Sequence, residues 1–267
     1  MPFSNKIRNG VCIMDKYQRL AQKLQNREKI LGFTIQLLNN PLFIPTVNRE
    51  DLDFVLFDAE HGIFDAQNAA QVFQVCRLLG LPALYRVQDS YYHLIAKAID
   101  IGADGVMIPR TETLEQLRTA VDALLFYPDG RKGFGGHGQS RPGERFEDFG
   151  KTRFLFPQIE SPKGIEMLPK MLEEYGRYIS AVVIGPYDLS IMLGTPKDIR
   201  SPAMVEAVQK IFDICAAYGK SCGTFCDDAA LAQVYRDMGC NFLWTGTDTS
   251  IFQKGYQAEM DALAKIL

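Results

Sequence analysis

Several polar residues that could carry chemistry in this chain share one position, directly after a run of apolar residues. They are Asp58, Glu60 and His61 after FVLF, Arg86 in ALYRV, Gln158 and Glu160 in FPQIE, Asp188 after AVVIGPY, and Thr247 and Asp248 in TGTD. Gln158 and Glu160 are two residues apart, so an extended strand presents both on one side. Acids, an amide, an arginine and a histidine suit metal and acid–base chemistry if the fold brings these positions together.

The residue types indicate which chemistry this is. Glu160 and Asp188 are carboxylates without clustered cysteine or histidine, which makes them hard oxygen ligands of the kind that bind Mg²⁺ or Mn²⁺. The fork of the Arg86 guanidinium suits a substrate carboxylate or the oxygen of a developing enolate. His61 is a natural proton carrier near neutral pH. Together they indicate metal-assisted enolisation of a 2-oxo acid.

The alternation of β-rich runs and helical periods predicts a scaffold that gathers these positions. Eight runs are expected as strands: Gly32–Leu37, Phe54–Asp58, Ala83–Val87, Gly105–Pro109, Phe154–Ile159, Ala181–Gly185, Ser221–Phe225 and Asn241–Gly246. Several are continuously apolar, which is typical of strands buried on both faces. We therefore predict a single α/β domain over residues 1–267, a (β/α)8 TIM barrel with its chemistry at the carboxyl ends of the strands. A doubly wound sheet is the alternative.

The predicted helices have recognisable ends. In Asp65–Leu79 apolar residues recur at three- and four-residue spacing, with Asp65 as a candidate N-cap and Gly80 as a candidate stop. Ser161-Pro162 is typical of a cap followed by the proline that opens a helix. Asp15–Glu28 predicts an extra helix before the first strand, and Ile251–Leu267 predicts a closing helix.

One segment, Phe126–Thr152, is glycine-rich and has no hydrophobic period. A loop of this length in a compact domain is usually functional or disordered. Its Gly133, Gly135 and Gly138 spell G-x-G-x-x-G, but no strand precedes the motif and no helix follows it, so we expect no dinucleotide site. A mobile lid or a subunit contact is the interpretation that we favour.

The composition of the 267 residues excludes several classes of protein. Lys and Arg number 29 against 32 Asp and Glu, for a net charge of −3, and no run of five like charges occurs. We therefore expect no nucleic-acid partner and no membrane partner. Without a signal peptide or an 18-residue apolar run, the chain is expected to be soluble and cytoplasmic. The six cysteines form no disulfide framework and are expected to be small hydrophobes of a reduced protein.

Six blocks of the sequence resemble those of a known family. DFVLFDAEHG, ALYRV, AIDIGADGVMIPR, QIESPKGIEML, VVIGPYDLS and TGTDTS are similar, in order and spacing, to the HpcH/HpaI aldolases, which are divalent-metal-dependent (class II) pyruvate aldolases. The resemblance runs from about Leu31 to the C-terminus. It implies a (β/α)8 barrel, in agreement with the strand count. It also implies a lyase that cleaves 4-hydroxy-2-oxo acids to pyruvate and an aldehyde through a pyruvate enolate.

The resemblance implies roles for individual residues as well. As metal ligands it implies Glu160 and Asp188, holding Mg²⁺, or Mn²⁺ or Co²⁺. As catalytic residues it implies His61 for proton transfer, Arg86 on the pyruvate oxygen, and Asp58 and Asp100 as acids that support the histidine. As substrate-binding residues it implies Arg86, Gln158, Gly185, Pro186, Tyr187 and Asp188. It further implies a homo-oligomer, a hexamer built as a trimer of dimers.

The chain also departs from the family at three places. Thr34 lies near the position where some members carry a tryptophan that lines the pocket, so the aldehyde side of the substrate is expected to differ. Asn40–Asp53 does not resemble the family's usual first helix, and Lys132 replaces a common arginine. These departures concern the choice of substrate and not the enolate chemistry.

Other interpretations of the same residues remain open. Lyases that act on CoA thioesters, of the malyl-CoA and citrate lyase type, share the barrel and its Glu/Asp pair, although the Asp-x-Glu-His block favours the pyruvate aldolases. A non-catalytic binder of oxo acids is a second alternative. Taken singly, Asp58, Glu160 or Asp188 could be helix N-caps, Arg86 could form a structural ion pair, and Asp100 could be an exposed acid at a helix end.

Overall fold

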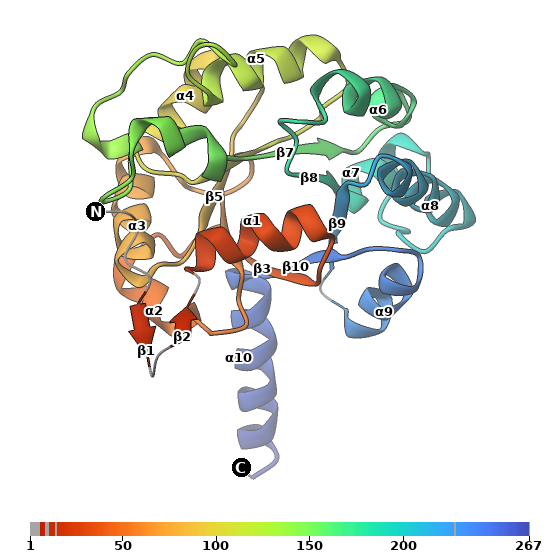
Figure 1. Cartoon of the computed structure of the whole chain (residues 1–267). Helices are drawn as coiled ribbons and strands as arrows, with labels where there is room; N and C mark the ends of the chain where they lie inside the picture. The colour runs from red at the N-terminus through yellow and green to blue at the C-terminus, as the bar shows by residue number, and fades with distance from the viewer. Residues whose placement is uncertain (1–5, 9–10, 14, 227, 267) are drawn as a thin grey trace.

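Eight strands close into a parallel barrel in the order β10-β3-β4-β5-β6-β7-β8-β9 (Figure 1). The computed structural model describes residues 6–8, 11–13, 15–226 and 228–266. Parallel pairing of β10 with β3 closes the ring, and helices surround it. The predicted (β/α)8 barrel is confirmed.

All eight predicted strands are present. Their bounds are β3 Ile30–Ile35, β4 Phe54–Asp58, β5 Ala83–Arg86, β6 Gly105–Ile108, β7 Phe154–Ile159, β8 Ala181–Ile184, β9 Ser221–Phe225 and β10 Phe242–Thr247. The first strand ends earlier than predicted, because the backbone N–H groups of Gln36 and Leu37 donate to the Asp248 carboxylate instead of to a neighbouring strand.

Aromatic side chains fill the inside of the barrel. The ring centroids of Phe54 and Phe242 lie 5.1 Å apart, and those of Phe156 and Phe242 lie 5.6 Å apart. Gly32 leaves room for this packing, since a Cβ atom at its position would lie 1.9 Å from Phe54 Cζ. Burial of whole aromatic rings contributes strongly to the free energy of folding. The part of the barrel interior that these rings fill is a packed core.

The extra N-terminal helix is confirmed as α1 (Lys16–Asn26). Its Leu20 and Leu24 join the apolar cluster inside the barrel. Ser221 Oγ, at the first residue of β9, donates a 2.6 Å hydrogen bond to the Leu24 carbonyl oxygen. The helix therefore closes the amino-terminal end of the barrel and leaves the opposite end for chemistry.

The other helices lie on the outside of the barrel (Figure 1). They are α2 Ile44–Val47, α3 Ala66–Leu79, α4 Tyr92–Asp100, α5 Leu114–Leu124, α6 Pro162–Tyr175, α7 Pro186–Met192, α8 Pro202–Ala217 and α9 Ala229–Asp237, with a 3₁₀ turn at Pro41–Phe43. The predicted caps are confirmed: Asp65 accepts from the N–H groups of Gln67 and Asn68, and Ser161 accepts from that of Gly164. Gly80 ends α3 with a φ of 65°, a conformation that favours glycine.

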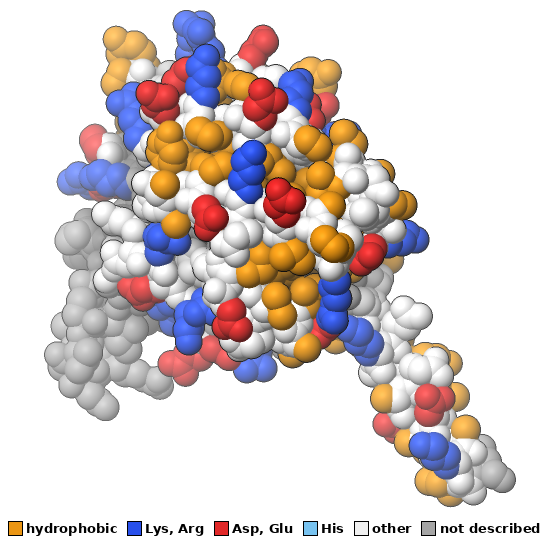
Figure 2. All heavy atoms as spheres, turned by 90° about the vertical axis from the view of Figure 1, so that its right-hand side faces the viewer, with side chains coloured by type: hydrophobic (Ala, Val, Ile, Leu, Met, Phe, Trp, Pro, Cys, Tyr) orange, Lys and Arg blue, Asp and Glu red, His pale blue; other side chains and the backbone are white. Residues whose placement is uncertain are grey.

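The closing helix, α10 (Asp248–Ala264), leaves the barrel and projects away from it (Figures 1 and 2). Residues 251–266 are all exposed. An apolar groove of about 530 Å³ lies beside the start of this helix, against β3 and the 3₁₀ turn; Phe33, Leu38, Phe43 and Val47 are among its lining residues. The groove is where the helix after the last strand of such a barrel would be expected to pack.

The glycine-rich segment Phe126–Thr152 is anchored to the barrel, and it includes the 3₁₀ turns His137–Gln139 and Phe146–Thr152. Arg141 Nε lies 2.8 Å from Asp104 Oδ1, and Arg153 Nη2 lies 2.7 Å from Glu144 Oε2, with all four side chains almost fully buried. Breaking a buried pair leaves an uncompensated charge, so this anchoring favours a fixed segment over the lid suggested by the sequence.

Two smaller features complete the fold. The short strands β1 (Lys6–Arg8) and β2 (Val11–Ile13) form an antiparallel pair outside the barrel. Five cysteines, at positions 76, 215, 222, 226 and 240, are free and buried as predicted, and Cys12 lies outside the residues whose side chains are described. Among the described residues, none of the helices has the length and apolar character needed to cross a membrane.

Candidate active site

A cavity of about 340 Å³ opens where the carboxyl ends of the strands meet. Seven of the residues that were given a catalytic, substrate-binding or metal-binding role line it: His61, Arg86, Gln158, Gly185, Pro186, Tyr187 and Asp188; Asp58, Asp100 and Glu160 are not among its lining residues. The seven lining residues come from four separate strand ends, and the closed parallel barrel is what gathers them. The lining also contains Thr34, Gln36, Leu56, Phe225, Trp244 and Thr247.

Arg86 and Asp58 form a two-bond ion pair at the ends of the adjacent strands β5 and β4. Arg86 Nε donates to Asp58 Oδ1 at 2.8 Å, and Arg86 Nη2 donates to Oδ2 at 2.6 Å. Burial alone would raise the pKa of Asp58, but the hydrogen bonds and charge of Arg86 outweigh it and hold that pKa below its usual value. The ionised form of Asp58 is therefore favoured; it fixes the guanidinium and accepts from the backbone N–H of His61 at 3.3 Å.

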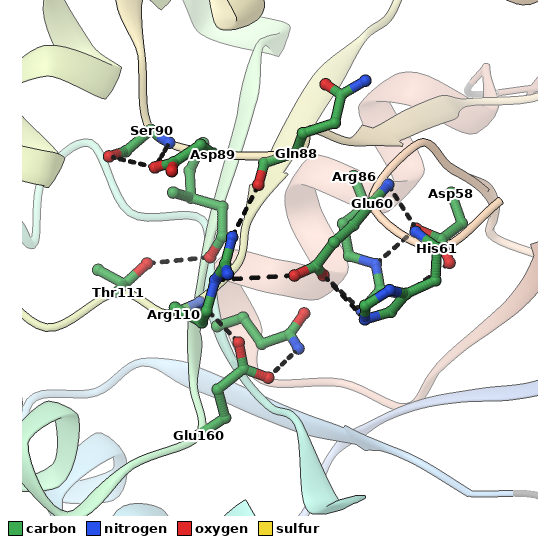
Figure 3. A network of polar contacts seen from close by, with 12 residues as sticks. Asp58, Glu60, His61, Arg86, Gln88, Asp89, Ser90, Arg110, Thr111 and Glu160 are labelled. Atoms are coloured by element: carbon green, nitrogen blue, oxygen red, sulfur yellow. Dashed lines mark hydrogen bonds and ion pairs between the residues drawn. The ribbon is translucent and has the colours of Figure 1, made fainter. Parts of the chain in front are cut away.

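Glu60 is a residue that the sequence interpretation left without a role. Its Oε2 atom lies 3.1 Å from Arg86 Nη1 and 3.8 Å from His61 Nε2, and its Oε1 atom lies 3.8 Å from Arg110 Nε (Figure 3). Burial raises the pKa of Glu60, although the charges of Arg86, His61 and Arg110 act in the opposite direction. The carboxylate beside the His61 ring is thus that of Glu60. The adjacency of Glu60 and His61 in the sequence is the feature from which this contact could have been predicted.

Glu160 lies just beyond β7 and is 3% exposed. Its Oε1 atom accepts a 2.6 Å hydrogen bond from the backbone N–H of Arg110, and its Oε2 atom accepts one from the Gln158 amide. Arg110 has a φ of 48°, a left-handed conformation uncommon outside glycine and often found at functional sites. Burial is the main reason that the pKa of Glu160 rises to about 7, and the nearby Asp188 and Glu60 charges add to it.

These residues fit a divalent cation. Asp188 lies exposed in the first turn of α7, and its charge is felt by Glu160. Gly185, directly after β8, lies against the Glu160 carboxylate. A side chain would not fit there, because a Cβ atom at position 185 would be 2.0 Å from Glu160 Oε2. Gln158 Oε1 is buried without a hydrogen-bond partner among the described residues. The two carboxylates supply oxygen donors, which are the type that Mg²⁺ prefers. No group of three or more His, Cys, Asp or Glu residues suited to a metal occurs in the described parts of the chain.

The structure does not bring Asp100 into this group. Asp100 is the last residue of α4, and its carboxylate forms an ion pair with the buried Lys132, in the glycine-rich segment. A Cβ atom at Gly135 would lie 1.9 Å from Asp100 Oδ1, so the segment packs directly on this acid. Within one chain, Asp100 anchors the segment and Glu60 is the acid beside His61.

Comparisons with known proteins agree with this geometry. A hydroxypyruvate/pyruvate aldolase from Delftia acidovorans is 30% identical over 214 residues, which cover 78% of each chain. A 2-keto-3-deoxy-L-rhamnonate aldolase from Salmonella gallinarum is 29% identical over 213 residues, covering 78% of this chain and 79% of that one. The solved structure of an HpcH/HpaI aldolase from Desulfitobacterium hafniense superposes with a TM-score of 0.84 at 25% identity, covering 92% of this chain and 96% of that chain.

The family described as HpcH/HpaI aldolase/citrate lyase matches residues 35–254, which include the whole cavity lining except Thr34. The strands β4 to β10, the pair of strand-end carboxylates and the Arg86–Asp58 pair all lie within this range. The chain belongs to the HpcH/HpaI aldolase/citrate lyase family of carbon–carbon lyases.

Proposed function

We propose that this protein is a class II pyruvate aldolase, which cleaves 4-hydroxy-2-oxo acids into pyruvate and an aldehyde through a pyruvate enolate. The observation that carries the proposal is that Asp188, Arg86 and His61 line one cavity, while the buried Glu160 lies directly behind Gln158 and Gly185 of the same lining. The names of two similar proteins, a hydroxypyruvate/pyruvate aldolase and a 2-keto-3-deoxy-L-rhamnonate aldolase, support it.

Glu160 and Asp188 would hold Mg²⁺, or Mn²⁺ or Co²⁺. When bound there, the cation supplies Lewis-acid polarisation of the 2-oxo group and neutralises enolate charge. The backbone of Gly185–Tyr187, at the start of α7, is proposed to lie against the substrate carboxylate, where the positive end of the helix dipole favours an anion; the Gly185 N–H itself donates to the Ile159 carbonyl oxygen. Gln158 is proposed to bind the substrate through its unpaired Oε1 atom, which can accept a hydrogen bond.

Arg86 is proposed to stabilise the oxygen that becomes negatively charged. A guanidinium has five N–H hydrogens, so contacts with Asp58 and Glu60 leave others for the substrate. Because Asp58 fixes the guanidinium before the substrate arrives, little reorganisation is needed during the reaction. His61, which lines the cavity with a side chain 59% exposed, is proposed to take the proton of the 4-hydroxyl group and to return one to C3 of the enolate.

A screen of 4-hydroxy-2-oxo acids tests this function. We expect the protein to release pyruvate from at least one of them in the presence of Mg²⁺ or Mn²⁺, measured with a coupled pyruvate reductase. Sodium borohydride with pyruvate should trap no lysine adduct, because the chemistry assigned here needs no Schiff base. Pyruvate release that persists in EDTA, or cleavage restricted to CoA thioesters, would contradict the proposal.

We also propose the cytoplasm as the place where the protein acts. The five free cysteines are consistent with that reducing compartment.

We also propose that the protein is a homo-oligomer in which α10 of one copy packs into the apolar groove of a second copy. Phe252, Tyr256, Met260 and Leu263 are exposed at spacings of four, four and three residues, which places them along one face of the helix. The groove beside β3 is mostly apolar, and α10 of the same chain lines it through its first residues, Asp248, Ile251 and Phe252, while the rest of that helix projects away. Exchange of identical helices about a two-fold axis would cover both surfaces at once.

Charge introduced on this helix should dissociate the assembly. We expect Met260→Glu and Leu263→Glu each to lower the solution mass measured by size-exclusion chromatography with light scattering, because a carboxylate cannot enter an apolar groove unpaired. Leu38→Glu, in the groove itself, should have the same effect. Glu259→Gln, on the same helix, is the control and should keep the mass of the unaltered protein. A monomeric unaltered protein, or variants that keep its mass, would exclude this arrangement.

A further inference from the structure

We infer that Gln36 is a positioning residue, which holds the Asp58–Arg86 pair in the orientation that the enolate oxygen requires. This inference rests on the proposed aldolase function and deepens it by adding a residue that acts through other side chains. Gln36 follows β3 directly, is half-buried and lines the cavity. Its side-chain amide, its carbonyl oxygen and its backbone N–H each bond to a different segment of the chain.

The side chain of Gln36 holds one oxygen of the Asp58 carboxylate. Its Nε2 atom donates to Asp58 Oδ2 at 2.8 Å. The other oxygen, Oδ1, accepts from the backbone N–H groups of Glu60 at 3.0 Å and His61 at 3.3 Å. Arg86 donates to both oxygens (Figure 3). Within the described parts of the chain, Gln36 is therefore the one partner of Oδ2 besides Arg86.

These contacts decide how firmly the guanidinium is oriented. The last torsion of an aspartate side chain has a broad energy minimum, so a carboxylate can rotate and an arginine bonded to both of its oxygens can turn with it. Hydrogen bonds to both oxygens from outside the pair oppose that rotation. A donor stabilises a developing oxyanion most when it needs no reorganisation during the reaction. Without the amide of Gln36, the guanidinium would be free to turn away from the enolate oxygen.

The backbone of Gln36 supports the loop that carries His61. Its carbonyl oxygen accepts from the N–H of Ile63 at 3.0 Å. Gly62 lies against this contact, since a Cβ atom there would be 2.7 Å from the Gln36 carbonyl oxygen and 2.1 Å from that of Asp58. Only a glycine allows the backbones to approach so closely. A substitution confined to the side chain at position 36 keeps the carbonyl contact, so it tests the contact with Asp58 alone.

Gln36 is itself fixed by Asp248, the first residue of α10. The Asp248 carboxylate is buried, and it accepts from the backbone N–H groups of Gln36 at 3.0 Å, Leu37 at 2.9 Å and Leu38 at 2.5 Å. Hydrogen bonds to an ionised group are roughly twice as strong as those between neutral groups. The amide of Gln36 therefore extends from a fixed backbone, which is what allows it to restrain Asp58.

The test is a double-mutant cycle that measures exchange of the pyruvate C3 protons in D₂O with Mg²⁺. Gln36→Met keeps the length of the side chain without its amide. We expect kcat for exchange to fall roughly 10-fold, near the lower end of the range for a hydrogen bond to a charged group, with the KM for pyruvate unchanged. In the Arg86→Lys protein the same substitution should cost less than about 2-fold, because Gln36 acts through the guanidinium. Gln71→Met, at an exposed position of α3, is the matched control and should exchange at the rate of the unaltered protein.

Three results would overturn the positioning role. They are an unchanged kcat in Gln36→Met, a raised KM, which would indicate direct contact with the substrate, and an equal loss in both backgrounds, which would indicate general damage to the fold. Thermal unfolding followed by circular dichroism shows whether each variant is folded at the assay temperature. An unaltered protein without any exchange would contradict the aldolase function and this role with it, whereas exchange that does not depend on Gln36 would remove the positioning role alone.

Discussion

The Glu160→Ala protein is expected to lose pyruvate C3 proton exchange down to the level of the unaltered protein in EDTA. Glu160 is the buried member of the carboxylate pair, and Asp188 alone is an exposed acid in the first turn of a helix. A single exposed carboxylate is expected to bind Mg²⁺ only weakly, because removing water from the hydration shell of this ion costs free energy. Exchange is followed by proton NMR of the pyruvate methyl signal in D₂O, and Mn²⁺ binding is followed separately by electron paramagnetic resonance.

The same carboxyl predicts a dependence of cation binding on pH. Burial raises the pKa of Glu160 to about 7 in the metal-free protein. Below that pH the group is protonated and a cation must displace the proton, so Mn²⁺ affinity should fall as the pH is lowered from 8 to 6. Equal Mn²⁺ affinity at both pH values, or full exchange by Glu160→Ala, would show that the cation binds elsewhere.

His61→Ala is the control that separates proton transfer from cation binding. We expect this variant to bind Mn²⁺ with the affinity of the unaltered protein. The His61 ring contacts Glu60 and takes no part in the hydrogen bonds of Glu160. Its exchange rate should fall by on the order of 10²–10⁴, the usual contribution of a general acid–base group. Unchanged exchange would leave His61 as a residue that only lines the cavity.

Arg86→Lys is expected to lose on the order of 10²–10³ in the exchange rate at saturating pyruvate, the typical effect of removing one preorganised donor at a developing oxyanion. The guanidinium makes two parallel hydrogen bonds to Asp58 and approaches Glu60 with its third nitrogen. An ammonium group is a compact charge that cannot reproduce this fork, so it satisfies Asp58 or the substrate but not both.

Arg110→Lys is the matched control for this prediction. The Arg110 side chain is 59% exposed and lies 3.8 Å from Glu60, whereas its contact with Glu160 is made by the backbone N–H. The same chemical change should therefore have a small effect at position 110. If Arg86→Lys turns over like the unaltered protein, or if both variants lose activity equally, Arg86 has a structural role and does not contact the enolate oxygen.

The amino-acid sequence was sufficient to predict the barrel and most of the cavity lining. Runs such as FVLF and AVVIG are short, apolar throughout and rich in β-branched or aromatic residues, which favours strands buried on both faces over helices. Once eight such runs alternate with helices, closure brings the following residues to one end, and Arg86, Gln158 and Asp188 indeed lie there. Caps such as Asp65 and Ser161 were predictable for the same reason, because their hydrogen bonds are local.

The tertiary structure decided every property that depends on contacts between distant residues. Only the packing shows that Asp58 is committed to Arg86, that Asp100 pairs with Lys132, and that Glu60 is the acid beside His61. The direction of α10 could not be predicted either. Its apolar face could be buried equally well in a groove of its own chain or in a groove of another copy.

Thr34 is a further example of this division. Its residue type is ordinary for a strand, and the sequence indicates only that Thr34 lies near a position that lines the pocket in some members of the family. The burial of its hydroxyl without a hydrogen-bond partner among the described residues, across the barrel from Glu160, depends on eight strands closing in one order. Sequence patterns determine which face of an element is buried, because that depends on local periodicity. Which polar atoms then find partners depends on distances between elements, and those are set only when the whole barrel packs.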